Sequence, residues 1–95
     1  MNTKNAIDFF CWEKDGPIEV QLEPEALTFT VLPGSNLRFV AICDNSDFRW
    51  SLRVTPEDKG VQLFPDTIGS YEIEIYENGE FIENWFLFIE NQQHR

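Results

Sequence analysis

Two cysteines and a single histidine are the side chains of this chain best suited to nucleophilic catalysis or to binding a transition metal. Cys11 and Cys43 are far apart in the sequence, and His94 is next to the last residue. A zinc site takes four ligands, and a blue-copper site takes two His and one Cys. Nucleophilic catalysis also needs a base and an orienting group. The sequence therefore predicts a protein that is not an enzyme and has no metal or cofactor.

The acidic turn at residues 44–47 offers oxygen ligands of the kind that calcium prefers. In this turn Asp44 and Asp47 flank Asn45 and Ser46. Carboxylate and carbonyl oxygens bind calcium, but the ligand spacing of an EF-hand loop is absent. Asp44 and Asp47 are thus calcium candidates, and an acidic turn that joins two strands is the interpretation that we favour.

The chain is strongly acidic, with seven Lys and Arg against seventeen Asp and Glu and a formal net charge of -10. Such a charge repels the phosphates of nucleic acids and of anionic membranes. We therefore expect neither nucleic acid nor a membrane as partner. The charge is compatible with a basic partner or a divalent cation. It is also compatible with a charge that serves only to keep the protein soluble.

The sequence shows neither a signal peptide nor a membrane span. Asp8 and Glu13 bracket a very short apolar stretch near the N-terminus, and no apolar run reaches the about 18 residues of a span. We therefore expect a cytoplasmic protein. In that reducing compartment Cys11 and Cys43 are expected to be buried thiols, whereas secretion would allow a disulfide between them.

Apolar residues recur at every second position along most of the chain, which is the period of a half-buried strand. Turn residues interrupt this pattern about every ten residues, as at Pro33-Gly34 and Asp44–Asp47. The pattern predicts an all-β fold, an antiparallel two-sheet sandwich of seven to eight strands. The 95 residues form one domain in this interpretation, with an N-terminal covering strand or arm at 1–13, a sandwich core at 17–90 and a flexible tail at 91–95.

Residues 17–90 resemble a bacterial immunoglobulin-like domain. The resemblance rests on Pro33-Gly34 before an apolar strand, on Trp50 in the next strand, and on the segment 66–71 before the penultimate strand. It implies a core role for Trp50 and a tyrosine-corner role for Tyr71. The inter-sheet disulfide of the family would join a residue near Leu37 or Phe39 to one near Ile73, and these positions are not Cys. The resemblance thus implies a relative without a disulfide, and the fold alone implies no function.

The segment 70–89 has the pattern of a β-hairpin with an Asn78-Gly79 turn. A two-residue type I′ loop pairs Glu77 with Glu80 and Tyr76 with Phe81. Continued without a break, this register turns Asn84 toward the core, and a β-bulge near residues 83–84 would avoid that by shifting the last strand by one residue. In either register the predicted last strand has large apolar side chains on both faces.

Those apolar faces need a cover, and two covers are compatible with the sequence. The first is the N-terminal arm with Phe9, Phe10 and Trp12, and the second is another molecule, which includes a homodimer through the last strand. We expect a protein-interaction module, with a structural or self-assembly domain as the alternative, and calcium or carbohydrate binding as less favoured functions. The interaction candidates combine exposed aromatic residues with two arginines that we expect beside Glu72 and Glu74: Trp12, Trp85, Phe86, Phe88, Arg49 and Arg53.

Overall fold

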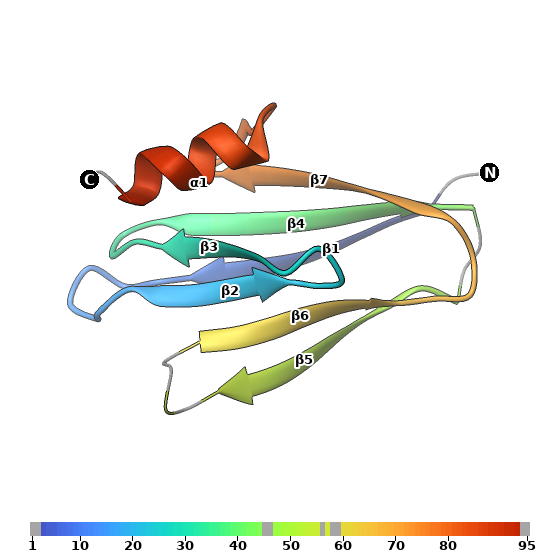
Figure 1. Ribbon diagram of the computed structural model, residues 1–95, viewed down its shortest axis with the longest axis horizontal. Coiled ribbons are helices and arrows are strands. Elements are labelled where there is room, and N and C mark those ends of the chain that lie inside the picture. Colours follow the sequence, from blue (N-terminus) through green and yellow to red (C-terminus); the bar gives the residue numbers. More distant parts are fainter. Residues whose placement is uncertain (1–2, 45–46, 56, 58–59, 94–95) are drawn as a thin grey trace.

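The computed structural model describes residues 3–44, 47–55, 57 and 60–93, and these form eight strands and one helix (Figure 1). In chain order, the elements are β1 (Thr3–Phe10), β2 (Ile18–Leu22), β3 (Leu27–Val31), β4 (Asn36–Cys43), β5 (Arg49–Thr55), β6 (Gly60–Asp66), β7 (Tyr71–Glu77), β8 (Glu80–Phe81) and α1 (Trp85–Gln93).

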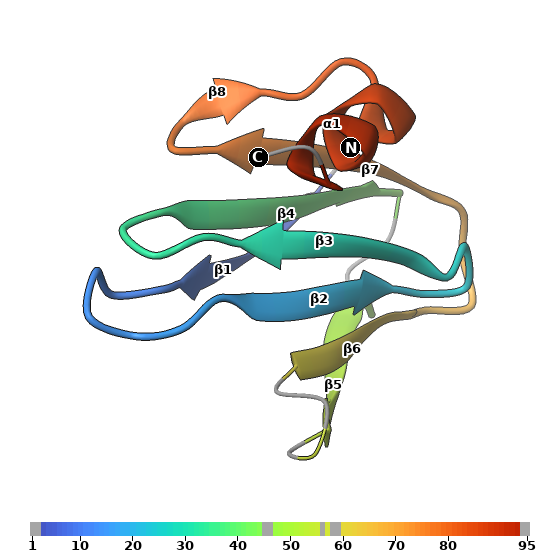
Figure 2. The same cartoon turned by 60° about the vertical axis from the view of Figure 1, so that its left-hand side comes forward.

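The strands form two four-stranded sheets that pack as a sandwich (Figure 2). The order in the first sheet is β1-β4-β7-β8, and all its pairs are antiparallel. The order in the second sheet is β3-β2-β6-β5, in which β2 and β6 run parallel. The predicted all-β two-sheet class is confirmed. The second sheet is mixed, however, because β2 lies between its hairpin partner β3 and the distant β6.

The core between the sheets is built from alternate residues of the central strands. On β4, Leu37, Phe39, Ala41 and Cys43 are all buried, as their spacing of two predicts, whereas Arg38 is exposed. Phe29 of β3 meets Phe39 edge to face at 5.6 Å, which joins the two sheets. Such edge-to-face contacts add to the gain from apolar burial.

The N-terminal segment forms an edge strand of the first sheet. All eight residues of β1 pair with β4, from Thr3 opposite Cys43 to Phe10 opposite Asn36. At the same side of the sandwich the indole N–H of Trp50, on β5, donates a hydrogen bond of 3.0 Å to the main-chain oxygen of Asn5. This bond ties the edge of one sheet to the edge of the other.

The Asn78-Gly79 turn has the predicted geometry. Both residues have positive φ, 51° for Asn78 and 86° for Gly79, as a type I′ turn requires. Tyr76 pairs with Phe81 and Glu77 with Glu80, which confirms the predicted register. One more main-chain bond follows, from Ile82 N–H to Ile75 oxygen at 2.9 Å, and then the chain leaves β7.

The predicted last strand is wrong, because residues 85–93 form helix α1 (Figures 1 and 2). Beyond residue 82, therefore, neither the strict register nor the bulge exists, and a homodimer through a last strand at 85–89 has no strand to use. Asn84 caps the helix, and Trp85, Phe88 and Ile89 pack against the core at the helical spacing i, i+3 and i+4. Residues 91–93, expected in a flexible tail, form the last turn of α1.

One further expectation, which depends on strand order, also fails. Arg49 and Arg53 lie on β5 beside β6, where Arg49 is opposite Asp66 and Arg53 is opposite Gln62. They do not lie beside Glu72 and Glu74, because β7 belongs to the other sheet.

The strands β4 and β7 are direct neighbours, with Phe39 opposite Ile75. The positions that the immunoglobulin-like resemblance joins across the sandwich therefore lie within one sheet.

Candidate functional site

The hairpin β7–β8 supplies the first wall of the candidate site. The rings of Tyr76 and Phe81 lie opposite each other with their centroids 5.5 Å apart. The Tyr76 hydroxyl donates a hydrogen bond of 2.9 Å to Glu74 Oε1. This hydrogen bond is the main reason why the pKa of Tyr76 lies above its usual value. Burial and the negative charge of Glu74 raise the pKa further. Phe81 keeps 52% of its surface exposed, so the hairpin presents an aromatic side chain to solvent.

Helix α1 supplies the second wall, and its orientation is fixed by the core. Trp85 and Phe88 both face Phe29, at centroid distances of 6.3 Å. Phe86 and Leu87, the two residues between them, therefore point away from the core and are 71% and 52% exposed. A helix turns about 100° per residue, so residues 85 and 88 cannot face inward without turning 86 and 87 outward.

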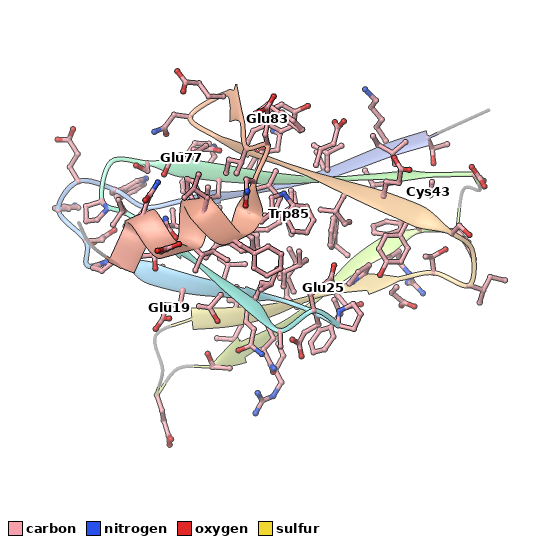
Figure 3. The ribbon with its side chains drawn as sticks, turned by 45° about the horizontal axis from the view of Figure 1, so that its top comes forward. Glu19, Glu25, Cys43, Glu77, Glu83 and Trp85 are labelled. Atoms are coloured by element: carbon pink, nitrogen blue, oxygen red, sulfur yellow. The ribbon has the colours of Figure 1, made fainter. Side chains whose placement is uncertain are left out.

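Between these walls lies an open groove of about 340 Å³, which we call the acidic groove. Its apolar part comes from Phe81, Ile82, Leu87 and Phe88. Its charged part comes from Glu77, Glu80 and Glu83, and among the residues that the structure describes no Lys or Arg lines it. Figure 3 shows Glu83 just before Trp85 and Glu77 on the strand beside α1.

The chemistry of the acidic groove suits binding of a cation that carries an apolar group. Three carboxylates next to exposed aromatic and aliphatic surface attract Lys or Arg side chains and also remove apolar groups from water. Exposed apolar surface rimmed by polar residues is a mark of interaction sites.

The interaction candidates predicted from the sequence separate into three places. Trp85, Phe86 and Phe88 are together on α1, where only Phe86 is exposed and Trp85 and Phe88 pack on the core. Trp12 follows β1, is 66% exposed, and has the ammonium of Lys14 5.4 Å from its ring centroid.

The two predicted arginines form the third place. Arg49 and Arg53 are exposed on β5, at the edge of the second sheet opposite to β3. Arg53 donates a hydrogen bond of 2.7 Å to Gln62 Oε1. The structure therefore does not bring the arginines together with the aromatic candidates.

The calcium candidates lie in a turn of which residues 45 and 46 fall outside the described residues. Asp44 is exposed, and Asp47 Oδ1 accepts a hydrogen bond of 2.8 Å from the Thr67 hydroxyl. Among the residues that the structure describes, no three His, Cys, Asp or Glu side chains are grouped so that they could hold a metal ion. His94 also falls outside the described residues.

Both cysteines are free and buried, as the sequence predicts for a reducing compartment. Cys11 Sγ donates to the main-chain oxygen of Gly16 at 3.2 Å, and Asn5 Nδ2 lies 3.4 Å from Cys43 Sγ. These contacts are those of structural thiols inside the fold.

Two larger grooves were not predicted from the sequence: one lies over β1, β4 and β7 of the first sheet, and the other lies at the loops that follow β1 and β3. One, of about 480 Å³, includes Lys4, Arg38 and Glu74. In it Arg38 makes a two-point ion pair with Asp8 at 2.7 and 3.1 Å, and this hydrogen-bonded pair raises the pKa of Arg38. The other, of about 680 Å³, includes Trp12, Glu13 and Lys14. Both grooves contain positive and negative side chains. They therefore favour a basic or an acidic partner less strongly than the acidic groove favours a basic one.

Sequence reasoning missed the acidic groove because it treated α1 as a strand. The signal for the helix was present, since Asn84 is a favoured N-cap residue and the spacing of Trp85, Phe88 and Ile89 is helical.

Comparison with protein-family models, with curated proteins and with solved structures finds no match for this chain. No helix in the described part of the chain has the length and apolar character needed to cross a membrane.

Proposed function

We propose that this chain is a protein-interaction module, and that its acidic groove binds a basic segment with apolar side chains on a partner protein. One observation carries the proposal: the exposed Phe81 and Leu87 lie in a groove where every charged side chain among the described lining residues is a glutamate, namely Glu77, Glu80 and Glu83. The net charge of -10 acts in the same direction, because it steers basic partners toward the molecule. The proposed activity is binding and not catalysis.

We also propose that the fold is immunoglobulin-like. Two packed sheets and the position of Trp50 against the core support it. Helix α1 and the direct pairing of β4 with β7 are departures from that family.

A defined peptide probe tests the proposed binding. The probe is a fluorescein-labelled amphipathic peptide of Lys and Leu. The control peptide has Glu in place of each Lys and is otherwise identical. We expect the Lys peptide to raise its fluorescence anisotropy on addition of the protein and the Glu peptide to remain free. Raising the ionic strength from about 0.01 M to about 0.15 M should weaken the binding, because salt screens exposed charges.

Matched variants separate the acidic groove from the overall charge. Phe81→Ser with Leu87→Ser should weaken binding at least tenfold, whereas Leu52→Ser, at a site that is 49% exposed on β5, should leave it unchanged. Glu80→Gln with Glu83→Gln should weaken binding more than Glu25→Gln with Glu72→Gln, which removes the same charge elsewhere. Equal weakening by the two charge pairs would show that the Lys peptide responds to net charge alone and would overturn the proposal.

A further inference from the structure

The side chain of Gln92 is bound to the main chain of an edge strand. Its Oε1 accepts a hydrogen bond of 3.0 Å from the N–H of Thr30, and its Nε2 donates one of 2.7 Å to the oxygen of Thr30. Gln92 lies in the last turn of α1, and Thr30 lies on β3, the edge of the second sheet. One side-chain amide therefore occupies both main-chain groups of one edge residue.

This contact has the chemistry of strand pairing. A primary amide offers the same N–H donor and C=O acceptor as a peptide unit, and in an antiparallel sheet a neighbouring strand makes this pair of bonds to one residue. An open edge strand is a template for such a neighbour, and proteins commonly cover it. Gln92 therefore occupies on Thr30 the position that an added strand would take.

The direction in which the main-chain N–H and C=O of Thr30 point also determines the direction of the same groups of Thr28. Glu19 faces Thr30 and Gln21 faces Thr28 in the β2–β3 pair. Thr30 bonds outward to Gln92, so the pairs Glu19–Thr30 and Gln21–Thr28 are the ones in which the two residues make no main-chain hydrogen bonds to each other. Thr28 therefore also points its main-chain N–H and C=O away from β2.

The sequence of β3 is close to a palindrome, Leu-Thr-Phe-Thr-Val. If two such edges run antiparallel about Phe29, Thr28 of each copy lies opposite Thr30 of the other, and Leu27 lies opposite Val31. This register uses the outward-pointing groups of Thr28 and Thr30, and it places no charge opposite a like charge. Thr–Thr pairs across strands are favourable.

We propose that the β3 edge is a pairing surface for a second copy of this chain, and that Gln92 is the latch that closes it. Release of the last turn of α1 would expose Thr30 and let two β3 strands join, so that four strands from each copy form one continuous sheet. The edge–edge contact carries no charge, whereas each copy carries a net charge of -10. Salt should therefore favour this dimer, whereas it weakens binding of the Lys peptide. The proposal does not rest on the acidic groove, and the two can fail separately.

Oligomeric state measured by light scattering after size-exclusion chromatography tests the latch. At micromolar concentration and about 0.15 M salt, we expect wild type to elute with a mass of 11.2 kDa and Gln92→Ala to shift toward twice that mass. Asn91→Ala, an exposed position on the same helix, should stay a monomer. Thr30→Pro added to Gln92→Ala should restore the monomer, because proline removes the outward N–H of an edge residue.

Hydrogen exchange of the Thr30 amide provides a readout that does not depend on dimer formation. The amide should be protected in wild type, and Gln92→Ala diluted to the monomer should lose at least tenfold of that protection while its far-ultraviolet circular dichroism stays native. A Gln92→Ala protein that stays monomeric at every salt concentration would overturn the proposal. So would a dimer that persists after Thr30→Pro, or a Thr30 amide that exchanges equally fast in wild type.

Discussion

The side-chain oxygen of Asn84 accepts a hydrogen bond of 3.0 Å from the main-chain N–H of Leu87, three residues along the chain. This is the geometry of an N-cap, in which a side chain satisfies one of the unpaired N–H groups at the start of a helix. The main-chain oxygen of Asn84 accepts the first helical bond, from Phe88 N–H at 3.0 Å. Asn84 thus marks the start of α1.

Replacement of this cap should destabilise the domain. We expect Asn84→Ala to lower the free energy of unfolding by about 1 kcal/mol, the usual value for losing such a cap. Urea unfolding followed by tryptophan fluorescence measures the change. Asn84→Ser keeps an oxygen that can cap the helix and should recover most of the loss. If Ser and Ala prove equally destabilising, the bond to Leu87 is not the source of the effect.

A side chain in place of the turn glycine at 79 should destabilise the protein. The φ of 86° at this glycine lies in a region that costs an L-residue roughly 1–2 kcal/mol, so Gly79→Ala should destabilise the protein by about that amount. Gly16 is the control, because a Cβ there would meet no atom within 4 Å and its φ is not positive. Gly16→Ala should be nearly neutral in the same urea experiment. A neutral Gly79→Ala would contradict the type I′ turn.

Phe29 should be the most sensitive core position near the helix. It is fully buried and contacts the rings of Phe39, Trp85 and Phe88. Phe29→Ala should lower the free energy of unfolding by about 3–5 kcal/mol, whereas Phe86→Ala should change it by less than about 0.5 kcal/mol. Thermal melting and urea unfolding distinguish the two. Similar losses at both positions would mean that Phe86 is not on the outer side of α1.

Both tyrosines should ionise at higher pH in the folded protein than in urea. Burial, together with the charge of Glu25, raises the pKa of Tyr71, and the hydrogen bond to Glu74 raises that of Tyr76. A raised folded pKa means that the protonated phenol is favoured by the fold. This stabilisation is complete below the unfolded value of about 10 and is lost as the pH rises through the folded value.

Ultraviolet absorbance of the phenolate groups measures these titrations in the native and urea-unfolded states. Tyr76→Phe should leave one native titration and reduce the fall in stability at alkaline pH. Native and unfolded titration curves that coincide would contradict the environments of both residues.

Local patterns were sufficient for the parts of the fold that local chemistry determines. The Asn78-Gly79 pair predicts its turn and the Tyr76–Phe81 register, because few other residues accept positive φ at both positions. The alternation in β4 predicts its buried face in the same way. These features depend on residues that are close in the sequence or on the two-residue alternation of apolar and polar side chains.

The remaining features depend on contacts between distant segments. The run from Trp85 to Ile89 is rich in residues that favour strands, and packing of α1 on Phe29 overrides that preference. The partners of Arg49 and Arg53 follow from the order of strands in space, which no local pattern contains. The acidic groove could not be predicted for the same reason, since Leu87 reaches the carboxylates of the hairpin only when α1 is a helix.

The parallel pairing of β2 with β6 has a consequence for how the chain folds. Val20 and Val61 lie side by side, although three strands, β3, β4 and β5, lie between β2 and β6 in the chain. Contacts between such distant residues slow folding, and domains dominated by them reach the native state in milliseconds to seconds. During synthesis, β2 and β3 leave the ribosome before β6 exists. The early hairpin must therefore remain without its second neighbour until most of the chain has been made.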